Sequence, residues 1–136
     1  MNERVILQKW LSVFGEGVDK TMLEEHVTSC GNLLWHLFTW GEVPCLEGEE
    51  ASRAFDALSY TEAIRFYDGY AGHIENVAAV PKLSARQVEQ DKAGDVYITA
   101  ADFSWTYVRT HEHRIGLGPY LCIKRNKTNI SPEVSV

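Results

Sequence analysis

The chain has 136 residues, which fits one compact domain, because domain sizes cluster at roughly 100–150 residues. Hydrophobic residues make up 45% and charged residues 24%, as in an ordinary globular domain and unlike a disordered or fibrous chain. The net charge of −6 is uneven: residues 1–68 carry 5 basic and 12 acidic groups (−7), whereas residues 69–136 carry 8 basic and 7 acidic groups (+1). This acidity argues against nucleic-acid binding, which needs a Lys/Arg surface to neutralise phosphates.

The N-terminal stretch MNERVILQKWLSVFGEG is charged within four residues and lacks the uninterrupted apolar core of a signal peptide. No apolar stretch approaches the ~18 residues that span a bilayer. Cys30, Cys45 and Cys122 are widely spaced and form no C-x-x-C pair, so they indicate neither a disulfide framework nor a zinc ribbon. We therefore expect a cytoplasmic protein with no membrane segment and with reduced, mostly buried thiols.

Two helices are predicted at the front of the chain. Within residues 4–14 the apolar side chains recur at i, i+4, i+7 and i+8, the spacing of one helix face. A second helix is predicted from about Asp19 to Ser29, with Asp19 or Thr21 capping its start and Gly31 supplying a left-handed stop. Both helices need an apolar surface to lie on.

The next two segments are a strand and a helix. LLWHLFTW, residues 33–40, is short, aromatic and bounded by glycines, which predicts a strand buried on both faces. EGEEASRAFDAL, residues 47–58, predicts a third helix. The acidic residues Glu47, Glu49 and Glu50 fall in its first turn, where carboxylates favour the positive end of the helix dipole.

The middle of the chain is less regular. AIRFYDGY, residues 63–70, favours a strand, although Ser59 and Glu62 have the spacing of a capping box and leave a helical start open. LSARQVEQDKAG predicts a short exposed helix, since Ser84 and Gln87 match a capping box and a glycine follows as a stop.

The last third of the chain predicts a β-meander. DVYITA (95–100), SWTYVRTH (104–111) and PYLCIKR (119–125) are β-rich runs with short connections, so they are expected to pair as antiparallel neighbours. Residues 126–136 show no amphipathic period and are expected to form a flexible tail. We therefore predict one α+β domain over residues 1–125, an antiparallel sheet with a C-terminal meander and the N-terminal helices packed on one face.

The stretch DFSWTYVRTHEH, residues 102–113, holds the densest group of ionisable residues in the meander. Strand alternation would place six of its side chains on one face: Phe103, Trp105, Tyr107, Arg109, His111 and His113. Two imidazoles spaced H-x-H can bind one metal ion, but a site needs a third ligand, and no spacing in the chain demands one. We predict no metal and no cofactor, with a site at His111 and His113 as the alternative.

A histidine paired with a carboxylate could also act as an acid–base group. The candidates are His36, His111 and Glu112, with His113 and Asp102 as further members. Such pairs also occur as plain structural hydrogen bonds, and the chain has no G-x-S-x-G nucleophile elbow. Cys45 has no neighbouring lysine or arginine in sequence to lower its pKa, which favours an inert thiol. These patterns favour a protein that is not an enzyme.

Several short stretches together resemble a family of small, uncharacterised bacterial proteins, found mainly in Gram-positive bacilli and defined as a domain of unknown function. They span about residues 35 to 120 and are Trp35-His36-Leu37-Phe38, Cys45-Leu46-Glu47-Gly48-Glu49-Glu50-Ala51, Ala54-Phe55-Asp56, Asp95-Val96-Tyr97, Asp102-Phe103-Ser104-Trp105-Thr106, Thr110-His111-Glu112 and Gly118-Pro119-Tyr120. The resemblance implies a bacterial cytoplasmic single-domain protein and transfers no catalytic residue.

The preferred hypothesis is a non-enzymatic protein that binds another macromolecule through its acidic first half, for example an immunity-like protein that captures a basic toxin. The candidate contact residues are Trp40, Glu42, Glu47, Glu49 and Glu50. The alternative is a small enzyme or metal-binding protein with a His/Glu site on the strand around His111. A protein partner is expected, with no nucleic acid and no membrane, and the chain is expected to be a monomer or a homodimer that pairs strand edges.

Overall fold

The structure is a computed structural model that describes residues 2–27, 34–39, 43–69, 73–92, 94–112 and 116–124. Within these residues a six-stranded sheet has the order β1-β6-β5-β4-β2-β3, and all neighbouring strands are antiparallel. The helices are α1 (Glu3–Phe14), α2 (Lys20–His26), α3 (His36–Thr39), α4 (Gly48–Ala57) and α5 (Ala85–Glu89). The strands are β1 (Leu46–Glu47), β2 (Glu62–Asp68), β3 (Ile74–Pro81), β4 (Val96–Ala100), β5 (Trp105–Arg109) and β6 (Tyr120–Ile123).

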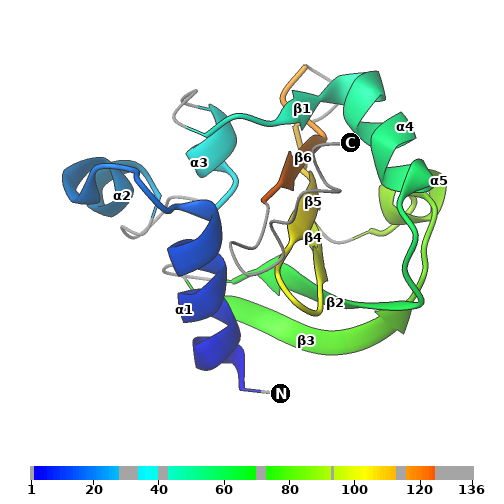
Figure 1. The fold of residues 1–136 in the computed structure, drawn as a ribbon, viewed down its shortest axis with the longest axis horizontal. Helices are drawn as coiled ribbons and strands as arrows, with labels where there is room; N and C mark the ends of the chain where they lie inside the picture. The colour runs from blue at the N-terminus through cyan, green and yellow to red at the C-terminus, as the bar shows by residue number, and fades with distance from the viewer. Residues whose placement is uncertain are drawn as a thin grey trace, which may run out of the picture.

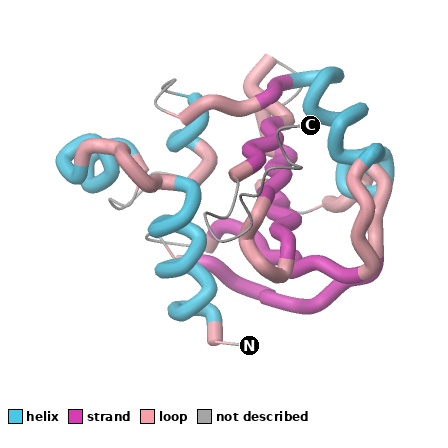
Figure 2. The backbone as a smooth tube through the Cα atoms, in the orientation of Figure 1, coloured by secondary structure: helices cyan, strands magenta, loops and turns pink. Residues whose placement is uncertain are grey.

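Helices lie on both sides of the sheet. Figure 1 shows α1 on one side and α4 with α5 on the other, and Figure 2 shows the strands between them. The side chains of β4 and β5 alternate between two buried clusters, so that Tyr97 and Val108 join α1 while Ile98 and Tyr107 join α4. Every residue of β4 and β5 is buried, as expected of central strands that are covered on both faces.

The predicted α1 forms as its pattern indicates. Asn2 caps its start by accepting from the Val5 N–H at 3.1 Å, and Trp10 and Phe14 on its apolar face are fully buried. Trp10 also carries a polar atom into the core, where its Nε1 donates to Thr106 Oγ1 at 3.0 Å. Thr106 in turn shares a 2.8 Å hydrogen bond with Thr99 on β4, so the side-chain polar atoms of Trp10, Thr99 and Thr106 are all hydrogen-bonded.

The opposite face is built from α4 and α5. Phe55 of α4 stacks on Tyr107 of β5, with ring centroids 4.0 Å apart and an interplanar angle of 9°. The predicted capping box at the start of α5 is present in both directions: the Gln87 N–H donates to Ser84 Oγ, and the Ser84 N–H donates to the Gln87 side chain. These two helices form one wall of the cavity described below.

The predicted α+β class and the antiparallel C-terminal meander are confirmed. The predicted helices over residues 4–14, 19–29 and 47–58 appear as α1, α2 and α4, and the predicted strand at 63–70 appears as β2. The front helices contribute to one apolar cluster, whereas α4 contributes to the other. Helical periodicity gives the apolar stripe of each helix but not the face of the sheet that the stripe covers.

The strand predicted at residues 33–40 is wrong, because the described part of this segment turns into the short helix α3. The Leu37 N–H donates to the Leu34 carbonyl at 3.1 Å, and the Phe38 N–H donates to the Trp35 carbonyl at 3.0 Å. A short apolar run is buried on all sides in either conformation, so its sequence period does not distinguish a strand from a helical turn.

The single-face placement of Phe103 with Trp105 and Tyr107 is also wrong. Phe103 has φ of 60° and lies in the turn between β4 and β5, before the regular strand begins. It therefore joins the apolar cluster under α1, while Trp105 and Tyr107 join the cluster under α4. Two further strands, β1 and β3, were not predicted; β1 is two residues long, and β3 contains Glu75 and Asn76 and ends at Pro81.

Candidate functional site

The most chemically organised part of the described chain is the turn that follows β5. The carboxylate of Asp95 accepts from both the backbone N–H and the Nδ1 of His111, each at 2.9 Å. Asp95 is buried, whereas 45% of the His111 side chain is exposed. With Nδ1–H donating to the carboxylate, the Nε2 of a neutral His111 is an acceptor. A buried acid thus orients a histidine that solvent can reach, which is the geometry of a general base.

Glu112 lies beside this pair because the strand alternation stops before it. β5 ends at Arg109, and the Thr110 hydroxyl donates to the Leu117 carbonyl while accepting from the Glu112 N–H. Glu112 Oε2 then lies 3.8 Å from His111 Nε2. The predicted pairing of His111 with Glu112 is therefore present geometrically, at the place where the strand ends.

A second acid, Asp68, lies close enough to Asp95 and His111 for their charges to act on it. Asp68, the last residue of β2, accepts from the Tyr97 hydroxyl at 2.5 Å and from the Leu34 N–H at 3.4 Å. Burial raises the pKa of Asp68 to about 7, and the nearby charge of Asp95 adds to the rise, while the hydrogen bond from Tyr97 opposes it. Burial likewise raises the pKa of Tyr97 well above its ordinary value. This region therefore holds a carboxyl group that titrates near neutral pH.

Trp35 connects the two predicted histidines. The ring of His36 lies 4.3 Å from the Trp35 ring, and the ring of His111 meets it edge-on at 6.0 Å. Both histidines therefore contact one buried tryptophan. The indole Nε1 of Trp35 is buried and has no hydrogen-bond partner among the described residues.

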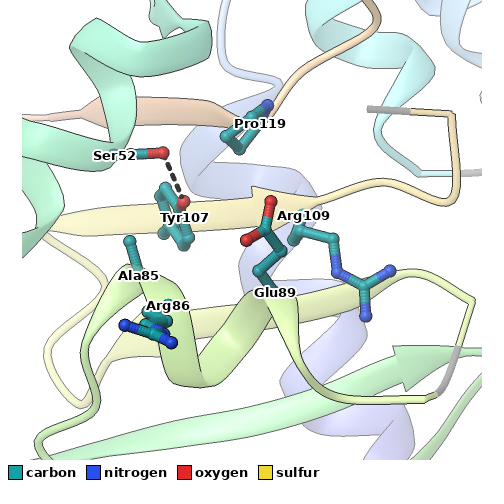
Figure 3. A pocket seen from close by; sticks show the side chains of 7 residues that line it. All are labelled: Ser52, Ala85, Arg86, Glu89, Tyr107, Arg109 and Pro119. Carbon is teal, nitrogen blue, oxygen red and sulfur yellow. Dashed lines mark hydrogen bonds between the residues drawn. The ribbon is translucent and has the colours of Figure 1, made fainter. Parts of the chain in front are cut away.

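A cavity of about 340 Å³ opens on the other face of β5, and we call it the α4–α5 pocket. It is lined by Ser52, Ala85, Arg86, Glu89, Tyr107, Arg109 and Pro119. Figure 3 shows Ser52 of α4 facing Tyr107 of β5, and their hydroxyl oxygens are 3.1 Å apart. Its volume lies at the lower end of the range for small-ligand sites, which is roughly 300–1,000 Å³.

Arg109 contributes its aliphatic part to this pocket and directs its charged end elsewhere. Its two terminal nitrogens donate to the backbone carbonyls of Gly94 at 3.0 Å and Asp91 at 2.6 Å. In Figure 3 the guanidinium accordingly points away from the Ser52–Tyr107 pair. A charged residue at the end of the buried strand WTYVR could have drawn attention to this position, but only the fold shows which carbonyls it reaches.

Two carboxylates act on Tyr107 at the floor of the pocket. Burial is the main cause that raises the pKa of Tyr107 to about 12; the hydrogen bond with Ser52 opposes the rise, while Asp56 and Glu89 add to it, each more strongly than Arg109 lowers it. Asp56 is held beside the pocket because its Oδ1 accepts from the Ala85 N–H at 2.7 Å. The Tyr107 hydroxyl therefore lies near two carboxylates, in a pocket whose lining also includes Arg86 and Arg109.

The acidic candidates at the end of β1 and the start of α4 are at the surface. Glu47, Glu49 and Glu50 are all exposed, and Glu49 lies 3.5 Å from Arg53 in an exposed i,i+4 pair. Such exposed pairs contribute little to stability, so Glu49 remains available to another charged group. Trp40, Glu42, His113 and Cys30, together with the predicted tail at residues 126–136, lie outside the described residues.

Two findings from the described ranges bear on the alternative of a metal site and on the expected absence of a membrane segment. In those ranges no three histidine, cysteine, aspartate or glutamate side chains gather as metal ligands would. None of the helices there combines the length and apolar character needed to cross a bilayer. The sequence prediction did not include Asp68, Asp95 or Tyr97 among the candidate site residues. Asp68 ends β2 and Asp95 directly precedes β4, and their contacts with Tyr97 and His111 form only when the chain folds.

The chain belongs to the family described as Domain of unknown function (DUF4275), whose profile matches residues 6–121. This confirms the resemblance at the level of the family. No curated protein and no solved structure matches the chain. The description of the family gives no activity, so the function is argued from the geometry of the residues.

Proposed function

We propose that this family member is a bacterial cytoplasmic protein that binds a basic protein partner, with the α4–α5 pocket at the centre of its contact surface. The observation that carries the proposal is the grouping of carboxylates around this pocket. Glu49 lies three residues before Ser52 and Asp56 four residues after it, about one helical turn in each direction, and Glu89 lines the pocket itself. Neutralising a basic toxin is one form that this function could take.

The pocket suits a cationic side chain of the partner. The Tyr107 hydroxyl and the Ser52 hydroxyl offer hydrogen-bond acceptors, and the surrounding carboxylates offer opposite charge. The guanidinium of Arg109 is turned toward backbone carbonyls, which reduces its repulsion of an incoming cation. Arg86 also lines the pocket, but it is an exposed residue that can extend into solvent.

Calorimetric titration with two synthetic peptides of equal length, one rich in Arg and Lys and one rich in Asp and Glu, tests the proposal. We expect the basic peptide to bind and the acidic peptide not to bind. The Glu49→Gln, Glu50→Gln double variant should bind the basic peptide about tenfold more weakly, because two exposed charges contribute roughly 0.5–1 kcal/mol each and 1.4 kcal/mol corresponds to tenfold.

The matched control is the Glu16→Gln, Glu24→Gln double variant, which removes the same charge from exposed residues at the front of the chain. Its affinity should stay within about twofold of the wild type, since charges beyond a Debye length of about 8–10 Å are largely screened at physiological salt. Equal weakening by both double variants would mean that binding depends on the net charge of the protein and not on the α4–α5 pocket. Binding of the acidic peptide alone would overturn the proposal.

The geometry of His111 favours a second candidate, a small enzyme that uses this histidine as a general base. The supporting observation is the buried Asp95 carboxylate on Nδ1 together with an Nε2 that is within 3.8 Å of Glu112. The two carboxylates lie beside different ring nitrogens, Asp95 at Nδ1 and Glu112 at Nε2. The metal-binding form of this candidate would need His113 and a third ligand as well.

Hydrolysis of 4-nitrophenyl acetate provides a first test of this second candidate. His111→Ala and Asp95→Asn should both lower the rate to that of free imidazole or less, whereas Glu50→Gln, on the exposed part of α4, should not change it. Elemental analysis of purified wild type, His111→Ala and His113→Ala tests the metal form. A rate that is the same in all variants, with no bound metal, would remove this candidate.

A further inference from the structure

Two of the three cysteines of the chain face each other across the edge of the sheet. β1 and β6 pair antiparallel with Leu46 opposite Leu121 and Glu47 opposite Tyr120. Continuing this register by one residue places Cys45 opposite Cys122. Both are free cysteines.

The hydrogen-bond pattern between β1 and β6 shows whether Cys45 and Cys122 occupy a hydrogen-bonded or a non-hydrogen-bonded pair of the ladder. The Gly48 N–H donates to the Pro119 carbonyl at 2.8 Å, so position 48 and every second position before it are hydrogen-bonded positions of the ladder. Cys45 and Cys122 therefore occupy a non-hydrogen-bonded pair, in which Cα atoms are about 4.5 Å apart. A disulfide bond tolerates Cα separations of roughly 4.4–6.8 Å.

The side chains also share one face of the sheet. Cys122 is buried in the apolar cluster under α1, and Cys45 packs against that same cluster. Leu46 and Leu121, the neighbouring pair, belong to the opposite cluster, as strand alternation requires. The pKa of Cys45 is raised mainly by burial and further by the charges of Glu47 and Cys122, which places the two sulfur atoms within electrostatic reach.

We propose that Cys45 and Cys122 form a reversible redox site, a cross-strand disulfide that fastens β1 to β6. Cys45 is half-buried and is the residue that an external oxidant can reach, while Cys122, at 1% exposure, is the resolving cysteine. The oxidant class is a low-molecular-weight disulfide such as oxidised glutathione. This inference does not depend on the proposed partner binding.

The exchange proceeds in two balanced steps. Cys45 loses its proton to solvent, and its thiolate attacks one sulfur of oxidised glutathione, which expels one glutathione thiolate and leaves a mixed disulfide on Cys45. Cys122 then loses its proton in turn, and its thiolate attacks Cys45 Sγ and expels the second glutathione thiolate. Two electrons pass from the protein to glutathione, and each expelled thiolate takes up a proton.

The burial of the pair makes this reaction slow at neutral pH. Burial raises the pKa of Cys45 to about 12 and that of Cys122 to about 11, so both groups are protonated thiols at pH 7. Because only the thiolate attacks, the initial rate should rise about tenfold for each pH unit between pH 7 and 9. The pair is thus expected to stay reduced except during sustained oxidation.

The bond would act on the rest of the molecule through α4. Glu47 ends β1 and Gly48 begins α4, so a crosslink at Cys45 fixes the strand from which this helix starts. It also closes a long loop, from residue 45 to residue 122, which restricts the unfolded chain. The melting temperature should therefore rise by several degrees on oxidation and return on reduction.

The experiment uses the full chain with Cys30→Ser, so that only the two cysteines of the pair remain. The protein is incubated with oxidised glutathione at pH 7, 8 and 9 and then examined for free thiols, for the intact mass and by non-reducing peptide mapping. We expect both thiols to disappear, the monomer to lose two hydrogen atoms, and one linked peptide pair to contain Cys45 and Cys122.

The matched controls are Cys45→Ser and Cys122→Ser in the same background. The Cys122→Ser control should stop at the mixed disulfide on Cys45, and the Cys45→Ser control should react little, because its remaining thiol is buried. A stable mixed disulfide in the protein that retains both cysteines would overturn the proposal, as would crosslinked dimers. A reaction rate that levels off near pH 8 would contradict the buried geometry of the pair.

Discussion

Asp68 is the residue whose ionisation should most affect stability. Its pKa is raised to about 7 in the folded protein, mainly by burial, from an ordinary value of 3.8. Below pH 4 both states hold the proton. Between about pH 4 and pH 7 the unfolded state ionises while the folded state does not, so the free energy of unfolding falls as pH rises, by up to about 4 kcal/mol. Above pH 7 Asp68 is ionised in both states, and the stabilisation that its protonated form gives to the folded protein is lost.

Asp68→Asn should remove this dependence, because an amide accepts from the Tyr97 hydroxyl without titrating. Urea unfolding at pH 4.5, 6 and 8 measures it, and the variant should gain stability relative to the wild type as pH rises. Asp102→Asn is the control: the hydrogen bond from Ser104 lowers the pKa of Asp102, so its small contribution has the opposite sign. An unchanged pH slope in Asp68→Asn would contradict the assignment.

At the residue scale, the sequence identified candidate functional residues better than it identified which residues contact one another. His111 and Glu112 were identified because they are adjacent in the chain, and the turn after β5 brings them together. Asp95 and Asp68 precede and follow strands that are remote in sequence, and they reach His111 and Tyr97 only through the order of the strands. Contacts of this kind are set by strand pairing, which local periodicity does not encode.

At the scale of single elements, α5 offers a direct test of capping. The Ser84 side chain accepts from the Gln87 N–H at 3.1 Å and completes a capping box on a helix of five residues. Ser84→Ala should lower the free energy of unfolding by about 1 kcal/mol, because it leaves an N–H at the helix start without its partner. Urea denaturation at constant pH measures the change.

Ser59 is a matched control for that substitution. Ser59 with Glu62 has the same spacing as Ser84 with Gln87, yet Glu62 begins β2 and no helix follows. Ser59→Ala should therefore change the free energy of unfolding by less than about 0.5 kcal/mol. Equal losses in the two variants would show that the stabilisation does not come from capping.

The two motifs with capping-box spacing also show that the surrounding structure decides which element forms. Two motifs of the same spacing lead to a helix after Ser84 and to a strand from Glu62, because the residues after Ser59 pair with both β3 and β4. The apolar run at 33–40 gives the reverse case, in which strand composition forms the helical turn of α3 against Tyr120. Tertiary packing overrides local propensity in both segments.

At the scale of the whole molecule, the sheet makes the two apolar layers interdependent. β4 and β5 contribute Tyr97 and Val108 to the layer under α1 and Ile98 and Tyr107 to the layer under α4. If either layer separated from the sheet, the central strands would expose fully buried side chains on that face. Neither layer is therefore expected to persist alone, and the described domain should unfold in one transition.

Phe14→Leu and Phe55→Leu test this interdependence from opposite faces, since both rings are fully buried. Each substitution should lower the free energy of unfolding by about 1–3 kcal/mol through lost packing, while the transition stays single. Tryptophan fluorescence and far-ultraviolet circular dichroism, followed together in urea, should give coincident curves for the wild type and for both variants. Separate midpoints for the two signals in either variant would mean that the layers unfold independently, because Trp10 lies on one face and Trp105 on the other.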